Sequence, residues 1–130
     1  MYQFKIVLAV ALSGFSYLVG GYDKSIEALL ILAVLDYVTG IVNAALKGEL
    51  SSKIGMKGIC KKFFMFAIIA MTVAVERFIN QPESLHNLVV WFFVGNEAIS
   101  IVENIEGYIP LPPWLKKWLK KFRDKGGKPK

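Results

Sequence analysis

Two carboxylates stand inside apolar stretches of this sequence, where a charged group is most costly to place. Asp36 interrupts the run LLILAVLDYVTGIVNAAL, and Glu97 follows the run LVVWFFVGN. On insertion scales, a charged side chain at the centre of a bilayer costs about 2.5 to 3.5 kcal/mol. Both residues therefore indicate a site that is kept away from lipid.

Polar and small side chains recur at helical spacing around both carboxylates. Spacings of three, four and seven residues place side chains on one face of a helix. One such face in the segment 26–47 carries Asp36, Thr39, Gly40 and Asn43. A similar face in the segment 85–106 carries Asn96, Glu97, Ser100, Glu103 and Asn104.

The depths of these two faces can be compared if both segments cross a membrane in the same direction. Asp36 then lies level with Asn96 and Glu97. Thr39 and Gly40 lie level with Ser100, and Asn43 lies level with Glu103 and Asn104. Two faces of similar chemistry are thus predicted at similar heights.

Three interpretations of these faces remain open. Hydrogen bonds between buried helices contribute about 0.6 kcal/mol per pair, up to about 2, and explain the amides and hydroxyls. Carboxylates at that depth need shared protons, a cation or water, which favours a face that lines a pore or joins subunits. A proton relay for a transporter is less favoured, because no basic residue is expected at the same depth and no inverted repeat or pair of broken helices is visible.

Residue types for enzymatic or metal chemistry are scarce. Cys60 is the single cysteine and His86 the single histidine, so no metal-ligand pattern is present. There is no glycine-rich phosphate loop and no nucleophile beside a base. We therefore predict no enzyme activity, no catalytic or metal-binding residue and no cofactor.

The elements that must position these residues are transmembrane helices. The chain has 130 residues, of which 55% are hydrophobic, and its mean hydropathy is +0.47. The apolar residues fall into four blocks, and a helix needs about 20 residues to cross a bilayer. We predict an all-α integral membrane protein whose domain 1–109 holds four helices, at about 4–21, 26–47, 59–79 and 85–106. A three-helix form, with one short block lying flat, is the alternative, and the first block is expected to be a helix rather than a cleaved signal peptide.

Charge distribution predicts the orientation. With the amino terminus inside and four crossings, fourteen of the sixteen basic residues lie inside, as the positive-inside rule requires. Both termini are then cytoplasmic. Lys61 and Lys62 are expected to reach the inner interface beside a loop in which Gly48, Gly55 and Gly58 break any long helix and in which Ser51 or Ser52 caps a short one.

The tail 110–130 is predicted to form a separate amphipathic helix. Pro110, Pro112 and Pro113 separate it from the last membrane helix. A basic and aromatic helix of this kind lies in the membrane interface against anionic lipid. It serves either as a regulatory element or as a topology anchor, and nucleic-acid binding is not expected. The residues predicted to contact the membrane surface are Trp114, Lys116, Lys117, Trp118, Lys120, Lys121 and Phe122.

Residues 26–112 resemble the toxin-secretion/phage-lysis holin family (phage holin family 4 type) of phages and prophages of Gram-positive bacteria. Three motifs carry the resemblance: an Asp-hydrophobic-x-Thr-Gly run, a Ser-Ser-x-x-Gly-x-x-Gly loop with paired lysines, and an Asn-Glu-x-x-Ser-x-x-Glu-Asn run. Glu76 is the nearest match to an acidic residue that ends the third helix in this family, and its role stays open. The matching residues of the three motifs are Asp36, Thr39, Gly40, Ser51, Ser52, Gly55, Gly58, Lys61, Lys62, Asn96, Glu97, Ser100, Glu103 and Asn104.

This resemblance implies a homo-oligomer that accumulates in the bacterial cytoplasmic membrane and then opens large holes. The holes release an endolysin, which is cargo rather than a bound partner, and some members export a toxin. An antiholin is a possible partner. Two alternatives remain: a small ion channel or transporter that uses Asp36 and Glu97, and an antiholin-like partner that does not permeabilise the membrane.

Overall fold

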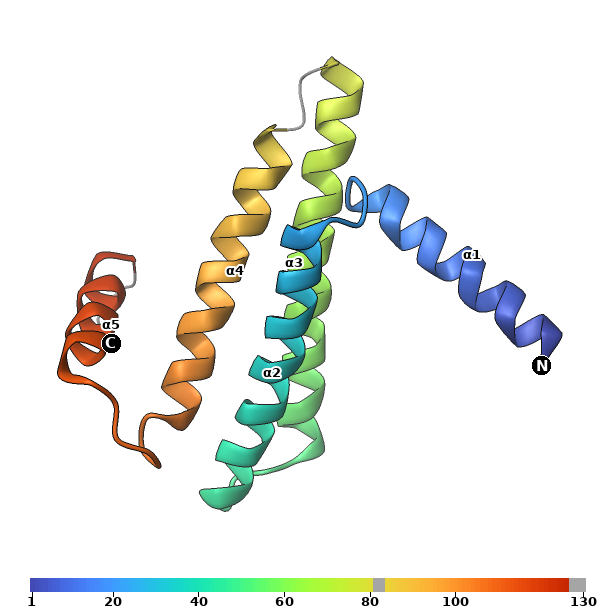
Figure 1. Cartoon of the computed structure of the whole chain (residues 1–130). Helices are drawn as coiled ribbons and strands as arrows, with labels where there is room; N and C mark the ends of the chain where they lie inside the picture. Colours follow the sequence, from blue (N-terminus) through green and yellow to red (C-terminus); the bar gives the residue numbers. More distant parts are fainter. Residues whose placement is uncertain (81–83, 127–130) are drawn as a thin grey trace.

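The protein is all-helical in the computed structural model, which describes residues 1–80 and 84–126, with the side chains of Ser84 and residues 122–126 left aside. No strand occurs in the described ranges, so the predicted all-α fold class is confirmed. The helices are α1 (Tyr2–Leu18), α2 (Lys24–Leu46), α3 (Ser52–Ile79), α4 (Ser84–Ile105) and α5 (Pro113–Gly126) (Figure 1).

Helices α2, α3 and α4 form a bundle in which α2 and α4 run in the same direction and α3 runs in the opposite direction (Figure 1). The apolar core lies toward the end of the bundle where α2 begins. On α3, the buried residues are Met65, Ile69, Thr72, Val73 and Glu76. None of the residues before Met65 on α3 is buried. In the half of the bundle that contains the start of α3, this helix is therefore not held by buried apolar side chains of its own. The apolar residues of the core are Val19, Ile26, Leu29, Ala33, Met65, Ile69, Val73 and Val90.

Three helices are long and apolar enough to cross a membrane: α2, α3 and α4. Their large apolar side chains outside the bundle, such as Val34 and Val38 on α2, are exposed, as lipid-facing positions require. Helix α1 is apolar but has only 17 residues, and it points away from the bundle (Figure 1). The structure is consistent with a membrane protein, and the number of crossings stays a prediction.

The α1–α2 connection fixes the start of α2. Asp23 caps that helix: its carboxylate accepts hydrogen bonds from the backbone N–H of Ile26 at 3.0 Å and the hydroxyl of Ser25 at 2.7 Å. The bond from the Ile26 N–H, followed by the bond from Ser25, holds the pKa of Asp23 below its ordinary value. Gly20 and Gly21, with φ of 87° and 107°, make the preceding turn.

Helix α3 begins well before the predicted residue 59. Ser51 caps it by accepting a hydrogen bond from the backbone N–H of Ile54 at 3.2 Å. The prediction that Gly55 and Gly58 break a long helix is wrong, because both lie within α3 and let the Tyr37 side chain approach. A Cβ at Gly58 would lie 3.0 Å from the Tyr37 ring, and the Tyr37 hydroxyl donates to the Gly55 carbonyl at 3.2 Å.

Glu76 and His86 join α3 to α4 at the opposite end of the bundle. One Glu76 oxygen accepts from the His86 backbone N–H at 2.5 Å, and the other lies 2.7 Å from His86 Nδ1. Both side chains are buried. A carboxylate at the first turn of a helix satisfies a free N–H and is favoured by the helix dipole. The role left open for Glu76 in the sequence is therefore a structural one.

The tail forms the predicted separate helix, α5, which starts at Pro113. Trp114 and Trp118 are exposed, whereas Leu119 is buried. The side chain of Phe122 and residues 127–130, which the sequence includes in this tail, lie outside the described part of the chain.

The contact between Gly20 and His86 yields a prediction. Gly20→Ala should destabilise the protein by about 1 to 2 kcal/mol, because alanine is strained at positive φ and its Cβ would lie 2.6 Å from His86 Nε2. Gly14→Ala is the matched control, since its Cβ meets nothing within 4 Å. Unfolding of both variants in detergent micelles, followed by circular dichroism, measures the difference. Equal stability of the two variants would contradict the described contact.

Candidate functional site

The amino group of Lys62 joins the two carboxylates that stand inside the apolar stretches of α2 and α4. Lys62 Nζ, from α3, donates to Asp36 Oδ2 on α2 and to Glu97 Oε1 on α4 at 2.6 Å. Asp36 and Glu97 are buried, at 8% and 4% of their surface exposed. One cation thus serves two carboxylates and connects all three helices of the bundle.

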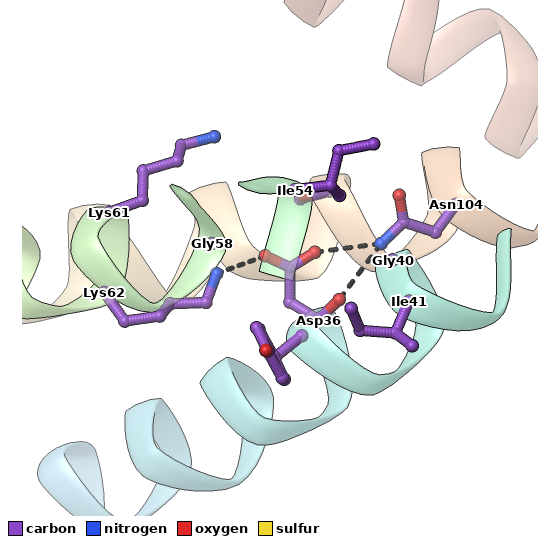
Figure 2. Close-up of a pocket in the computed structure, with 10 residues that line it drawn as sticks. Asp36, Gly40, Ile41, Ile54, Gly58, Lys61, Lys62 and Asn104 are labelled. Carbon is purple, nitrogen blue, oxygen red and sulfur yellow. Dashed lines mark hydrogen bonds and ion pairs between the residues drawn. The ribbon is translucent and has the colours of Figure 1, made fainter. Parts of the chain in front are cut away.

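This arrangement corrects the prediction that no basic residue lies at the depth of Asp36. Lys61 and Lys62 were both expected at the inner interface, yet only Lys61 is exposed. In Figure 2, Lys62 reaches toward Asp36 whereas Lys61 extends away from it. Neighbouring residues of a helix point about 100° apart, so the two lysines cannot share one environment.

Asn104 completes the set of hydrogen bonds around Asp36. Its side-chain Nδ2 donates to Asp36 Oδ1 at 3.1 Å and to the Asp36 carbonyl at 3.2 Å. It also lies 2.9 Å from Thr39 Oγ1, whose hydroxyl donates to the Leu35 carbonyl at 2.8 Å. The Asp36 carboxylate therefore receives a charged donor from α3 and a neutral donor from α4.

The faces of α2 and α4 pair one turn away from the predicted alignment. Thr39 pairs with Asn104, and Asn43 Oδ1 accepts from the Tyr108 hydroxyl at 2.9 Å, whereas Asn43 was expected level with Asn104. The shift places the Asn104 amide against Asp36 Oδ1, while Lys62 lies between Asp36 and Glu97 and compensates the charge of the two carboxylates.

Most of the predicted site residues meet within a single chain. We call the side chains that line the α2–α4 contact the polar face. Asn96 and Glu103 lie exposed on α4, beside this face rather than within it. Gly40 belongs to it because a Cβ there would lie 3.5 Å from Asn104 Nδ2. The members of the polar face are Asp36, Thr39, Gly40, Asn43, Glu97, Ser100 and Asn104.

A cavity of about 170 Å³ opens beside the polar face. Residues of all three helices line it, among them Asp36, Gly40, Gly58, Lys61 and Asn104 (Figure 2). The glycines contribute space, and the polar side chains make the walls able to hold water. The cavity therefore leaves space next to the ion pair, lined by Asp36, Lys62 and Asn104 among others.

The charged and polar groups of the site are paired with one another. Among the described residues, no group of three or more His, Cys, Asp or Glu side chains could hold a metal ion. No buried side-chain nitrogen or oxygen of the described residues lacks a hydrogen-bond partner. A buried ion cluster is tolerated only when its partners are satisfied in this way.

Three residues were not assigned to this site from the sequence: Lys62, which was expected at the inner interface, and Tyr37 and Tyr108, which were not singled out. The signal for Lys62 is its direction, because consecutive lysines point about 100° apart on a helix and one of them can face the neighbouring helices while the other does not. Tyr37 could have been sought from Gly55 and Gly58, because a spacing of three residues places both glycines on one face of a helix. Tyr108 follows the end of α4, where helical periodicity gives no guide.

Comparison with known proteins identifies the class. The model of the bacteriophage holin family matches residues 13–124. An uncharacterized protein of Clostridium perfringens (strain 13 / Type A) is 34% identical over 113 residues, covering 85% of this chain and 84% of the relative. An uncharacterized protein of Halalkalibacterium halodurans is 36% identical over 114 residues, covering 83% and 84%. The probable holin of Bacillus phage phi105 is 29% identical over 85 residues, covering 65% and 63%.

The chain therefore belongs to the bacteriophage holin family, and the resemblance drawn from its motifs is confirmed. No solved structure matches the chain significantly. Family membership supports a non-enzymatic membrane protein and a holin role.

The pairing of α2 with α4 predicts different effects for two asparagines of α4. Asn104→Leu should lower stability by about 1 to 2 kcal/mol, because it removes the donor to the buried Asp36 carboxylate and to Thr39 Oγ1. Asn96→Leu, at an exposed position, should change stability by less than about 0.5 kcal/mol. Unfolding with SDS in mixed micelles measures both. A larger loss for Asn96→Leu would show that the described pairing of α4 is incorrect.

Proposed function

We propose that this protein is a holin that accumulates silently in the bacterial cytoplasmic membrane and then assembles with copies of itself into holes that release an endolysin. The observation that supports this most directly is the polar face, which is paired inside one chain by Lys62 and Asn104. While it is paired, the outer faces of α2 and α4 present exposed apolar side chains that suit lipid, such as Val34, Val38 and Trp91.

The polar face gives the protein two alternative arrangements. Its carboxylates cannot be turned toward hydrocarbon without a large penalty. If the three helices separate, these side chains must meet either water or the same face of other copies. A wall built from many copies, with polar faces toward water and apolar faces toward lipid, satisfies both requirements.

The proposed setting follows the charge distribution. Both termini are placed in the cytoplasm, and α5 rests on anionic lipid through its lysines and exposed tryptophans. Endolysin, or a toxin, is cargo that passes through the hole. An antiholin is a possible partner, and no nucleic acid is involved.

A small ion channel is the second candidate, because the same ion cluster could line a narrow polar path. The two functions differ in the size of what passes. A channel dissipates the membrane potential only, whereas a holin hole passes folded protein.

The proposal predicts lysis that depends on a co-expressed enzyme. Inducible expression in bacteria, together with a cytoplasmic cell-wall hydrolase that lacks a signal peptide, should give an abrupt fall in turbidity after a delay. Without the hydrolase, cells should lose viability and leak a large cytoplasmic reporter enzyme but keep their turbidity. Loss of membrane potential without hydrolase-dependent lysis would instead support the channel, and no effect at all would support an antiholin-like protein.

The carboxylate of Asp36 should be required for hole formation. Asp36→Leu should insert in normal amounts, because it only adds apolar surface, but it should abolish hydrolase-dependent lysis, since an open hole would present leucine to water. Val38→Leu, at an exposed position of the same helix, is the matched control and should lyse on schedule. Lysis by Asp36→Leu at the normal time would contradict the role of the polar face.

A further inference from the structure

We infer that the ion pairs of Lys62 hold the protein in the state that forms no holes, and that hole formation requires the ammonium group to leave Asp36 and Glu97. We call this role of Lys62 the latch. This inference rests on the proposed holin function and adds the means by which the silent state is held. Its starting point is the contrast between the two ends of α3.

The first turns of α3 are attached to the bundle by polar contacts. The buried residues of α3 begin at Met65, so the segment from Ser52 to Phe64 contributes no side chain to the buried core. The described bonds that attach this segment are those of Lys62 to Asp36 and Glu97 and that of the Tyr37 hydroxyl to the Gly55 carbonyl at 3.2 Å. Without Lys62, the start of α3 would depend on Tyr37.

Lys62 is the part of the cluster that is able to move. Its side chain is 18% exposed, against 9% for Asp36 and 5% for Glu97. Its ammonium group stands at the end of a flexible four-carbon chain. The charge of this group is compact, unlike that of the rigid, planar guanidinium group of arginine. The cavity of about 170 Å³ beside it offers a polar route away from the carboxylates.

The charges of the cluster set the direction of the switch. Two carboxylates share one ammonium, so the ionised cluster carries a net charge of −1. When Lys62 leaves, two buried carboxylates face each other with no cation, and the repulsion favours their hydration. Departure of Lys62 therefore frees the start of α3 and brings water to the polar face in one step.

The matched pair Lys62→Gln and Lys61→Gln tests the latch. Both substitutions remove one positive charge from adjacent positions of α3, but only Lys62 holds the described ion pairs. Lysis in the presence of the hydrolase should begin earlier, and at a lower amount of membrane-bound protein, for Lys62→Gln. Lys61→Gln should keep the timing of the parent protein. The same timing for both variants would overturn the latch and leave the holin function in place.

A second measurement does not depend on lysis. Cys60→Ser removes the single cysteine, and Ser100→Cys then places a thiol on the polar face. N-ethylmaleimide reacts with thiols that water reaches. In isolated membranes, Lys62→Gln should raise the rate of labelling by about tenfold, the factor expected when a charge-assisted hydrogen bond becomes a neutral one, and Lys61→Gln should not change it. Equal labelling rates would overturn the latch even if the protein forms no holes.

A conservative variant covers the case in which Lys62→Gln fails to accumulate. Lys62→Arg keeps a cation between Asp36 and Glu97 and leaves both carboxylates in place. The latch predicts that this variant accumulates and protects the thiol at position 100 as the parent protein does. Rapid labelling of Lys62→Arg would overturn the inference.

Discussion

One ammonium group shared by two buried carboxylates is the interaction on which the half of the bundle that contains the start of α3 depends. Lys62 contacts Asp36 and Glu97 and so ties α3 to α2 and α4 where the core supplies no buried apolar side chain from α3. Buried ion clusters are weak sources of net stability, because desolvation offsets most of their attraction. They are effective at specifying an arrangement, since removing one member leaves an uncompensated charge.

The two halves of the bundle therefore have different properties. The half that contains Ile26, Leu29, Ile69 and Val90 is closed by apolar packing, and the bonds between Glu76 and His86 secure the α3–α4 connection there. The other half is closed by polar bonds next to a cavity. Polar bonds can be exchanged for bonds to water or to another copy, whereas apolar packing has no comparable substitute in water. This difference suits a protein that first lies in the membrane as a closed bundle and later exposes its polar face to water.

The sequence predicted the helices and the faces better than the contacts between them. Apolar blocks and helical spacing identified α2 and α4 and the polar side chains on each, because both signals are local. Asp36 and Glu97, which were expected level with each other, do meet through Lys62, but the contacts of Asn104 and Tyr108 with α2 lie one turn away from the predicted alignment, because helical spacing fixes a face and not its register against another helix. Gly55 and Gly58 were misread as helix breakers because their actual role, the approach of Tyr37, is a tertiary contact. The start of α3 was missed for the same reason.

The central claim is that the polar faces of α2 and α4 pair within one chain before holes form. Cross-linking of Thr39→Cys to Asn104→Cys by a short bifunctional thiosulfonate, in a Cys60→Ser background, tests it directly, because these two side chains meet, with Thr39 Oγ1 and Asn104 Nδ2 2.9 Å apart. Membranes would be treated before the onset of lysis and examined on a non-reducing gel. The account predicts a cross-linked monomer of altered mobility. A ladder of disulfide-linked dimers and larger species, with no cross-linked monomer, would contradict it.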